Sequence, residues 1–227
     1  MKKVLYVGSG RSSLVVKEID LSEYIIVCVN NSWRLFENKS FDVWIHSGDF
    51  PKYAYSPKEI YNKEISFNQY KKTAEIASKQ LNWKTSSPQH YVGYTIFFSG
   101  LYWIMMELKP KFIGLLGFDH DYNENKVKKW NEFDKPNIQN KFNLNRDEYS
   151  KANIYDWAND FFKDMDSDFF YGHGIPDPLR SGLGYEYLLD KFKLAKESSE
   201  KLGIDIINYS DLPSKVNIFK RGKINGK

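Results

Sequence analysis

Residues that can bind ligands or move protons follow several short apolar runs in this chain of 227 residues. Runs of this kind predict strands that are buried on both faces, as in a parallel sheet. Ligands of open α/β sheets sit beyond the carboxyl ends of the strands, so polar residues placed there are expected to converge on one site. The polar groups are 8–12 (Gly-Ser-Gly-Arg-Ser), 30–31 (Asn-Asn), 46–49 (His-Ser-Gly-Asp) and 119–122 (Asp-His-Asp-Tyr).

The first polar group has the make-up of a phosphate-binding turn. Gly8 and Gly10 stand between an apolar run and a helical pattern, where glycines let the backbone approach a ligand. The N-terminus of the following helix offers N–H groups and a partial positive charge. Ser9 and Ser12 add hydroxyl donors, and Arg11 lies between them. We expect these five residues to bind a nucleotide, with a tight β–α turn that holds no ligand as the alternative.

The same loop departs from the dinucleotide-binding fingerprint in two places. Ser13 stands where the third glycine of that fingerprint belongs, and Asn30 stands where an acidic residue would hold a ribose. These departures argue against a nicotinamide dinucleotide. A mononucleotide fits better, because the carboxamide of Asn30 can both donate and accept hydrogen bonds to a base or a ribose.

Asp119 and Asp121 form an Asp-x-Asp pair after another apolar run. Such a pair could hold Mn²⁺ or Mg²⁺ beside a diphosphate. Octahedral oxygen sites need more ligands than this pair supplies, so we do not favour a metal site. The alternative is that Asp119 caps a turn and that Asp121 is solvated.

His173 is the candidate general base, since a histidine can exchange protons near neutral pH. Glycines on both sides would let its loop reach into a cleft, and Asp177 could orient its ring. The alternative is that His173 is a surface histidine. His46 and His120, at strand ends, are alternative candidates for the general base.

Three tyrosines border the expected cleft: Tyr122, Tyr149 and Tyr171. Their hydroxyls are candidates for binding the phosphate of a nucleotide. Residues 123–150 are rich in Asn, Lys and Asp and show no clear periodicity, which is typical of a functional lid or a disordered insertion.

The elements that must position these residues alternate between strand and helix. The expected strands are 3–7, 25–29, 43–46, 112–116 and 204–208. The expected helical segments are 14–19, 57–83, 95–108, 151–165 and 185–202. This order predicts an α/β fold with a Rossmann-like, mostly parallel sheet and helices on both faces. Residues 1–122 and 151–210 form the domain, residues 123–150 form the lid, and residues 211–227 form a C-terminal tail.

Composition excludes several classes of protein. The net charge is only +4, and five of the 33 basic residues are arginine, which argues against a nucleic-acid partner. One cysteine, Cys28, excludes an intramolecular disulfide. No apolar run approaches the about 18 residues of a membrane span, so we expect a cytoplasmic protein. Peripheral membrane contact and a homo-oligomer remain open.

Taken together, these motifs resemble those of the bacterial sialyltransferases of the Campylobacter and Haemophilus lipooligosaccharide type. They resemble more loosely the motility-accessory and pterin-pyrophosphokinase-like Rossmann proteins. The resemblance runs from residue 1 to about residue 208. It is carried by the glycine–serine loop, the asparagine at position 30, the Ser99-Gly100 pair, the Gly-x-Asp that ends at Asp119, and the Gly-His pair at 172–173.

The resemblance implies a metal-independent, inverting transfer of a sugar from a cytidine monophosphate (CMP) donor to a glycan acceptor. It implies that Gly8, Gly10 and Ser12 form the donor loop and that Asn30 holds the nucleotide. It further implies that Ser99 and Gly100 line the donor pocket. Two residues are expected to be catalytic: Asp119, which matches the acidic residue after the core strand, and His173, which matches the base. The chain departs from the family at Ser9 and Arg11 (family Asn and Pro), at Ile96 (family Arg) and at Asp121 (family Tyr).

The expected reaction is a direct displacement in which His173 takes the proton of the acceptor hydroxyl. The leaving cytidylate is held by amides of the glycine loop and by the hydroxyl of Tyr122 or Tyr171. Two alternatives remain: a metal-dependent pyrophosphokinase or another nucleotide-handling enzyme on the same scaffold, and an inactive nucleotide-binding module. The fold alone does not choose among them.

Overall fold

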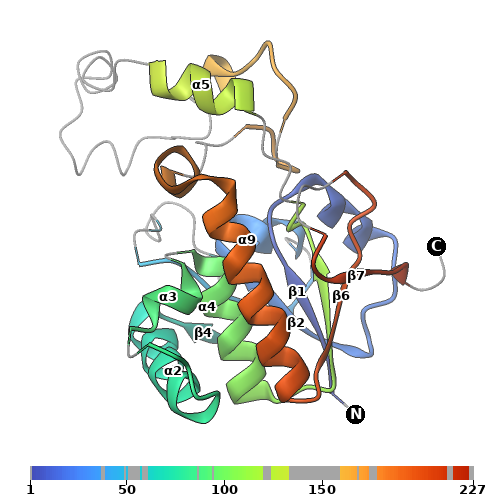
Figure 1. Ribbon diagram of the computed structural model, residues 1–227. Helices are drawn as coiled ribbons and strands as arrows, with labels where there is room; N and C mark the ends of the chain where they lie inside the picture. Colours follow the sequence, from blue (N-terminus) through green and yellow to red (C-terminus); the bar gives the residue numbers. More distant parts are fainter. Residues whose placement is uncertain are drawn as a thin grey trace.

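The computed structural model describes the chain in residues 2–36, 39–48, 50, 57, 61–85, 87–93, 95–119, 124–132, 159–167, 169–173, 178–213 and 217–224. Its core is a seven-stranded sheet in which every strand pairs with its neighbours in parallel. Helices cover both faces of this sheet (Figure 1). The predicted Rossmann-like α/β fold is confirmed.

The order of the strands places β1 at the point where the chain changes direction across the sheet. β1 pairs with both β2 and β5, and the full order is β4-β3-β2-β1-β5-β6-β7. The carboxyl ends of β1 and β5 therefore flank the topological switch point, where ligands of such sheets bind. The strands are β1 (Lys3–Val7), β2 (Tyr24–Val29), β3 (Phe41–Ile45), β4 (Tyr61–Ile65), β5 (Phe112–Leu116), β6 (Asp205–Asn208) and β7 (Lys220–Arg221).

Both faces of the central strand are covered by apolar side chains. Val4 and Tyr6 of β1 belong to one hydrophobic cluster, whereas Leu5 and Val7 belong to another. This alternation is what a strand with a period of two residues produces when each face meets a layer of helices. The first layer holds α2 (Phe67–Gln80), α3 (Gln89–Val92), α4 (Ile96–Trp103) and α9 (Pro178–Lys201), and the second holds the 3₁₀ helices η1 (Arg11–Lys17) and η2 (Asn30–Phe36).

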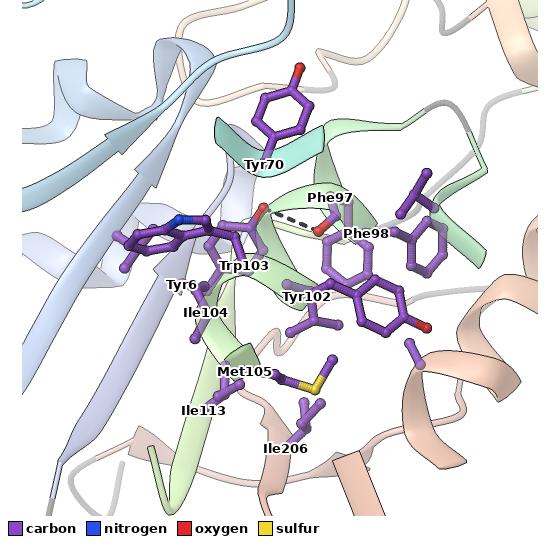
Figure 2. Close-up of a cluster of buried hydrophobic side chains, with 14 of the residues drawn as sticks. Tyr6, Tyr70, Phe97, Phe98, Tyr102, Trp103, Ile104, Met105, Ile113 and Ile206 are labelled. Atoms are coloured by element: carbon purple, nitrogen blue, oxygen red, sulfur yellow. Dashed lines mark hydrogen bonds between the residues drawn. The ribbon is translucent and has the colours of Figure 1, made fainter. Parts of the chain in front are cut away.

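Helix α4 is fixed to β1 by a buried tyrosine. The hydroxyl of Tyr6 lies 3.2 Å from the carbonyl oxygens of Ile96 and Phe97, and Figure 2 shows its bond to Phe97. A Cβ on Gly100 would lie 2.1 Å from the same hydroxyl oxygen, so the glycine is needed for this packing. The helix predicted over 95–108 is confirmed, and its last turn is the π-helical segment η3 (Ile104–Leu108).

The prediction that residues 211–227 form a tail outside the domain is wrong for the part that the structure describes. β7 pairs with β6, and Phe219 and Ile224 are buried. These apolar residues lie in a lysine-rich stretch. Because lysines suggest a solvated segment, the sequence does not show that this stretch packs against the sheet. The helix expected over 57–83 is confirmed at α2 and is wrong at β4. The Asn, Lys and Glu side chains of β4 suit the edge of the sheet, where one side of the strand meets solvent, and they hide the strand in the sequence.

The expected lid is described only in its first part, the helix α5 (Glu124–Glu132). In Figure 1, α5 lies beyond the N-terminal end of α9, outside the layers that cover the sheet. Residues 133–150 lie outside the described residues, as does most of the helix expected over 151–165. None of the helices in the described ranges is long and apolar enough to cross a membrane.

Candidate functional site

The glycine loop after β1 packs directly against the loop after β5. The N–H of Gly8 donates to the carbonyl of Leu116 at 2.7 Å, and the N–H of Gly10 donates to the carbonyl of Gly117 at 2.7 Å. A Cβ on Gly8 would lie 2.5 Å from the Gly117 oxygen. In this structure the glycines therefore allow the two loops at the switch point to approach each other.

Asp119 lies at the N-terminus of η1 and ties three loops together. Its Oδ2 accepts the N–H of Ser12 at 3.0 Å. Its Oδ1 accepts the hydroxyl of Ser210, after β6, at 2.8 Å, and also the hydroxyl of Ser12. The carboxylate thus supplies the negative charge that a helix N-terminus favours. This geometry makes Asp119 a positioning residue, and a direct catalytic part for it stays a prediction.

The loop keeps a small set of donors for a ligand. The N–H groups of Gly8, Gly10, Ser12 and Ser13 all donate within the protein. Within the described part of the chain, the N–H groups of Ser9 and Arg11 have no such partner, and Arg11 is exposed. A phosphate at this loop would therefore meet the amides of Ser9 and Arg11 rather than those of the glycines.

The segment 169–173 lies against the glycine loop and brings His173 toward it. Phe169 forms a bridge with Gly10, and the N–H of Phe170 donates to the carbonyl of Ser9 at 3.1 Å. The ring of Tyr171 lies under the guanidinium of Arg34 from η2, at 5.1 Å. The structure therefore brings together two of the predicted groups, the loop after β1 and the histidine loop. The segment after β2 reaches the histidine loop through Arg34, which was not among the predicted residues.

His173 is buried and held at two points. Its N–H donates to Oδ1 of Asn159 at 2.6 Å, and its Nδ1 lies 3.0 Å from Nζ of Lys126. Gly172 has a φ of 111°, in the region that favours glycine. A Cβ there would lie 2.2 Å from Oδ1 of Asn159. The sequence analysis missed Lys126, because one lysine in a lysine-rich helix carries no signal, and Asp177 lies outside the described residues.

The two asparagines after β2 have different surroundings. Asn30 accepts the N–H of Ser47 at its Oδ1, 3.0 Å away, and the indole N–H of Trp44 at its carbonyl, 2.9 Å away. It has a φ of 47° and joins the ends of β2 and β3. Asn31 is 1% exposed, and within the described residues neither polar atom of its side chain has a hydrogen-bond partner.

Asn31 is next to the switch point. Ser32 follows it, and the Ser32 hydroxyl donates to the carbonyl of Val7, the last residue of β1, at 2.7 Å. Thr95 Oγ1, at the start of α4, is a second buried atom that has no partner among the described residues. Buried polar groups are nearly always hydrogen-bonded, so both are positions where a polar ligand atom would be stabilised. The sequence analysis named Asn30 and passed over Asn31.

Other predicted candidates have a place in the packing or lie outside the described residues. His46 contacts Glu64 at 3.0 Å through Nε2 and the carbonyl of Ser47 at 3.1 Å through Nδ1, so both ring nitrogens are engaged. Ser99 is buried in α4 beside Gly100. His120, Asp121 and Tyr122 lie outside the described residues, and no cluster of three metal-ligating side chains occurs among the residues that are described.

Cys28 is unsuited to nucleophilic chemistry. It is fully buried in β2, and burial raises the pKa of its thiol well above the ordinary value. A thiol in this state is a poor source of thiolate. Among the described residues, the carboxyl edge of the sheet offers an imidazole, the carboxylate of Asp119, carboxamides, hydroxyls and arginines.

The chain was compared with family models, curated proteins and solved structures. No family model matches the chain, and no curated protein matches it. Among solved structures, the sialyltransferase CST-II in complex with CMP aligns with a TM-score of 0.48 and 19% sequence identity. The alignment covers 97% of this chain and 86% of that chain.

Proposed function

We propose that the chain transfers a sialic-acid-like sugar from a CMP-activated donor to a glycan acceptor, with inversion and with His173 as general base. The observation that carries this proposal is the buried carboxamide of Asn31, without a partner among the described residues. Its neighbour Ser32 bonds to Val7, where the glycine loop begins, and the His173 segment packs on that loop. A nucleotide bound at the carboxyl edge of the sheet would lie between these groups.

The carboxamide of Asn31 suits a pyrimidine base. A carboxamide has one acceptor and one donor group side by side. Cytosine presents an exocyclic amine beside a ring nitrogen, which is the complementary pair. An Asn31–cytosine contact would satisfy both atoms of the side chain and would recover the free energy that their burial costs.

The phosphate of the donor would meet positive groups from two elements. The amides of Ser9 and Arg11 belong to the glycine loop, and the guanidinium of Arg34 lies over Tyr171. Arginine binds phosphate through its planar set of N–H donors. The hydroxyl of Tyr171 belongs to the same hairpin as His173, and it can donate to the leaving phosphate.

In the proposed reaction, Nε2 of His173 takes the proton of the acceptor hydroxyl as its oxygen attacks the anomeric carbon. The bond from that carbon to the phosphate oxygen breaks, and CMP leaves with the electron pair. Stabilisation of the developing phosphate charge by fixed donors is usually the largest catalytic contribution. A well-placed base adds about 10²–10⁴-fold. No metal takes part in this scheme.

A nucleotide panel tests the proposal. Thermal shift with CMP, UDP and ATP, each with and without Mn²⁺, should show stabilisation by CMP that needs no metal. Release of CMP from CMP-sialic acid then measures turnover. Stabilisation by ATP with a divalent cation would favour a pyrophosphokinase, and CMP binding without turnover would favour a binding module; either result would overturn the proposed transfer.

A further inference from the structure

Lys191 is a buried lysine for whose amine the described part of the chain offers no hydrogen-bond acceptor and no ion pair. It lies on α9 and is 3% exposed. Its Nζ lies 4.3 Å from the centre of the Tyr187 ring, which gives a cation–π contact. The adjacent carboxylate, that of Asp190, is exposed and lies 3.7 Å from Nζ of Lys193. Lysines are almost never buried to this degree unless they are paired.

The amine of Lys191 points toward the carboxyl edge of the sheet. Helix α9 ends at Lys201 and β6 begins at Asp205, so the C-terminal end of α9 lies at the opposite edge. Because Nζ contacts the ring of Tyr187, one turn earlier, the lysine extends toward the N-terminal end of α9. The amine is therefore directed to the edge of the sheet that holds the candidate site.

The aliphatic part of Lys191 packs on the turn that leads from α3 into α4. A Cβ on Gly93 would lie 3.0 Å from Cγ and 3.7 Å from Cδ of Lys191, so this glycine leaves the room that the lysine occupies. Two residues later, Thr95 is the N-cap of α4, and its side chain makes no capping hydrogen bond. Its Oγ1 is buried and has no partner among the described residues. Two side chains that offer donors therefore adjoin this turn, and the described residues supply an acceptor to neither.

Aromatic packing connects this turn to the switch point of the sheet. The ring of Phe97, in the first turn of α4, lies 4.7 Å from the ring of Phe118. It also lies 5.2 Å from the ring of Phe192, the neighbour of Lys191. Phe118 belongs to the loop after β5, on which the glycine loop packs. The start of α4 is therefore packed between the switch point and the part of α9 that carries Lys191.

We propose that Lys191 binds the carboxylate of the sugar that the donor carries, with the hydroxyl of Thr95 as a second hydrogen-bond donor. This inference rests on the proposed function, because a sialic-acid-like sugar is a carboxylic acid. It assigns the choice between charged and neutral sugars to α9, an element outside the glycine loop and the His173 segment.

A bound carboxylate would offset what burial costs the amine. Burial lowers the pKa of Lys191 from its ordinary value of 10.5, and the carboxylate of Asp190 acts in the opposite direction. The carboxylate of a sugar beside Nζ would also favour the ammonium, and it would accept the hydrogen bonds that Nζ does not make within the described residues. The N-terminus of α4 adds a partial positive charge that attracts the same anion. A neutral sugar offers no such charge, so the site should discriminate between sugars by their charge.

Two variants test the assignment by comparing CMP-sialic acid with CMP, which lacks the sugar carboxylate. Lys191→Met replaces the amine with an apolar side chain of similar length. It should raise KM for CMP-sialic acid about 10-fold or more, as expected for the loss of a hydrogen bond to a charged group, and should keep the wild-type affinity for CMP. Thr95→Val should raise the same KM by a smaller factor. Lys193→Met is the matched control, because it removes an exposed lysine from the same helix, and it should change neither value.

Two further measurements need no turnover. The urea midpoint of Lys191→Met in the free protein should equal or exceed that of the wild type, because the substitution removes a buried amine that has no acceptor among the described residues. Thermal shift with N-acetylneuraminic acid and with its methyl ester compares two sugars that differ in the charge of the carboxyl group. The acid should stabilise the wild type more than the ester does, and Lys191→Met should abolish the difference.

The outcomes separate this inference from the proposed function. A Lys191→Met variant that loses stability, or whose KM for CMP-sialic acid equals that of the wild type, overturns the part assigned to Lys191. Equal stabilisation of the wild type by the acid and the ester, or stabilisation by neither, overturns it as well. A wild type that distinguishes the acid from the ester but does not turn over CMP-sialic acid supports the carboxylate site and overturns the proposed transfer.

Discussion

Ser12 and Asp119 are joined by two hydrogen bonds across the switch point of the sheet, one from the Ser12 amide and one from its hydroxyl. Residues 107 positions apart thereby fix the loops after β1 and β5 relative to each other. The Ser12 hydroxyl also accepts the N–H of Gly117 at 3.0 Å. A negative charge is thus built into the protein at the start of η1, and in the proposed function the phosphate of the donor would bind beside it.

Asp119→Asn should destabilise the protein. Three donors point at the two carboxylate oxygens, and a carboxamide offers only one acceptor oxygen. We expect a loss of about 1–3 kcal/mol in the free energy of unfolding, as for a buried donor left without a partner. Urea denaturation measures it. An unchanged midpoint would mean that this carboxylate does not hold the loops together.

Gly10→Ala should weaken both folding and CMP binding. The new Cβ would lie 2.4 Å from Oδ2 of Asp119 and 2.7 Å from the Gly117 oxygen, so η1 must move away from β5. Overpacking of this kind costs about 1–3 kcal/mol. Calorimetry with CMP and thermal denaturation measure the two effects. Gly48→Ala is the control, because its Cβ would meet only the exposed ring of Phe67, at 3.2 Å.

Asn31→Leu should separate stability from binding. The apolar side chain removes two buried atoms that have no partner among the described residues, so the free energy of unfolding should stay the same or rise by about 1–3 kcal/mol. CMP affinity should fall by about 10-fold or more, from two lost hydrogen bonds of about 1 kcal/mol each.

The matched control for Asn31 is Asn208. It is also buried, but its Oδ1 accepts the N–H of Ser210 at 2.9 Å. Asn208→Leu should therefore destabilise the protein. If Asn31→Leu also lost stability and kept its CMP affinity, the carboxamide would have a structural function. The main argument for nucleotide binding at this site would then be lost.

Alkaline pH should destabilise the fold through groups that burial keeps protonated. Burial raises the pKa of Tyr6 and of Cys28 well above their ordinary values. Their contribution to the free energy of unfolding is fully present below the pKa values of the unfolded chain, about 8.5 for cysteine and about 10 for tyrosine. It is lost as the pH rises above these values, because the unfolded chain then releases protons that the folded chain retains.

Urea midpoints between about pH 7.5 and about pH 10.5 test this dependence. The midpoint should fall with pH, and Tyr6→Phe should make the fall shallower above about pH 10 because it removes one of the groups. The same variant should lose about 0.5–1.5 kcal/mol at neutral pH, since it deletes the hydroxyl that bonds to the first turn of α4. A wild-type urea midpoint that does not change with pH would contradict the raised pKa values of Tyr6 and Cys28 in the folded protein.

The central strands and their polar ends could be predicted from the sequence because the signal there is local. Ile25 to Val29 is a continuous apolar run, and β2 contains it. Gly203 follows the last long helix with a φ of 64°, as expected for a glycine that ends a helix. Edge strands are harder to detect, because β4 and β7 are short and rich in polar residues.

The site could be predicted only in part, because its details depend on contacts between distant residues. The sequence pattern predicts nucleotide binding at Asn30. In the structure, however, it is the side chain of Asn31 that is buried without a partner among the described residues. Lys126 and His173 are 47 positions apart, and no spacing rule joins them. Likewise, the glycines at 8 and 10 predict a close approach, but not that the approaching group is the loop after β5.

The account is tested most directly by CMP-sialic acid turnover and CMP calorimetry, run in parallel on the wild type and His173→Ala. It predicts that the variant loses about 10²–10⁴-fold in kcat, the contribution of a general base, while its affinity for CMP stays that of the wild type. An unchanged kcat, or a wild-type chain that does not bind CMP, would contradict it.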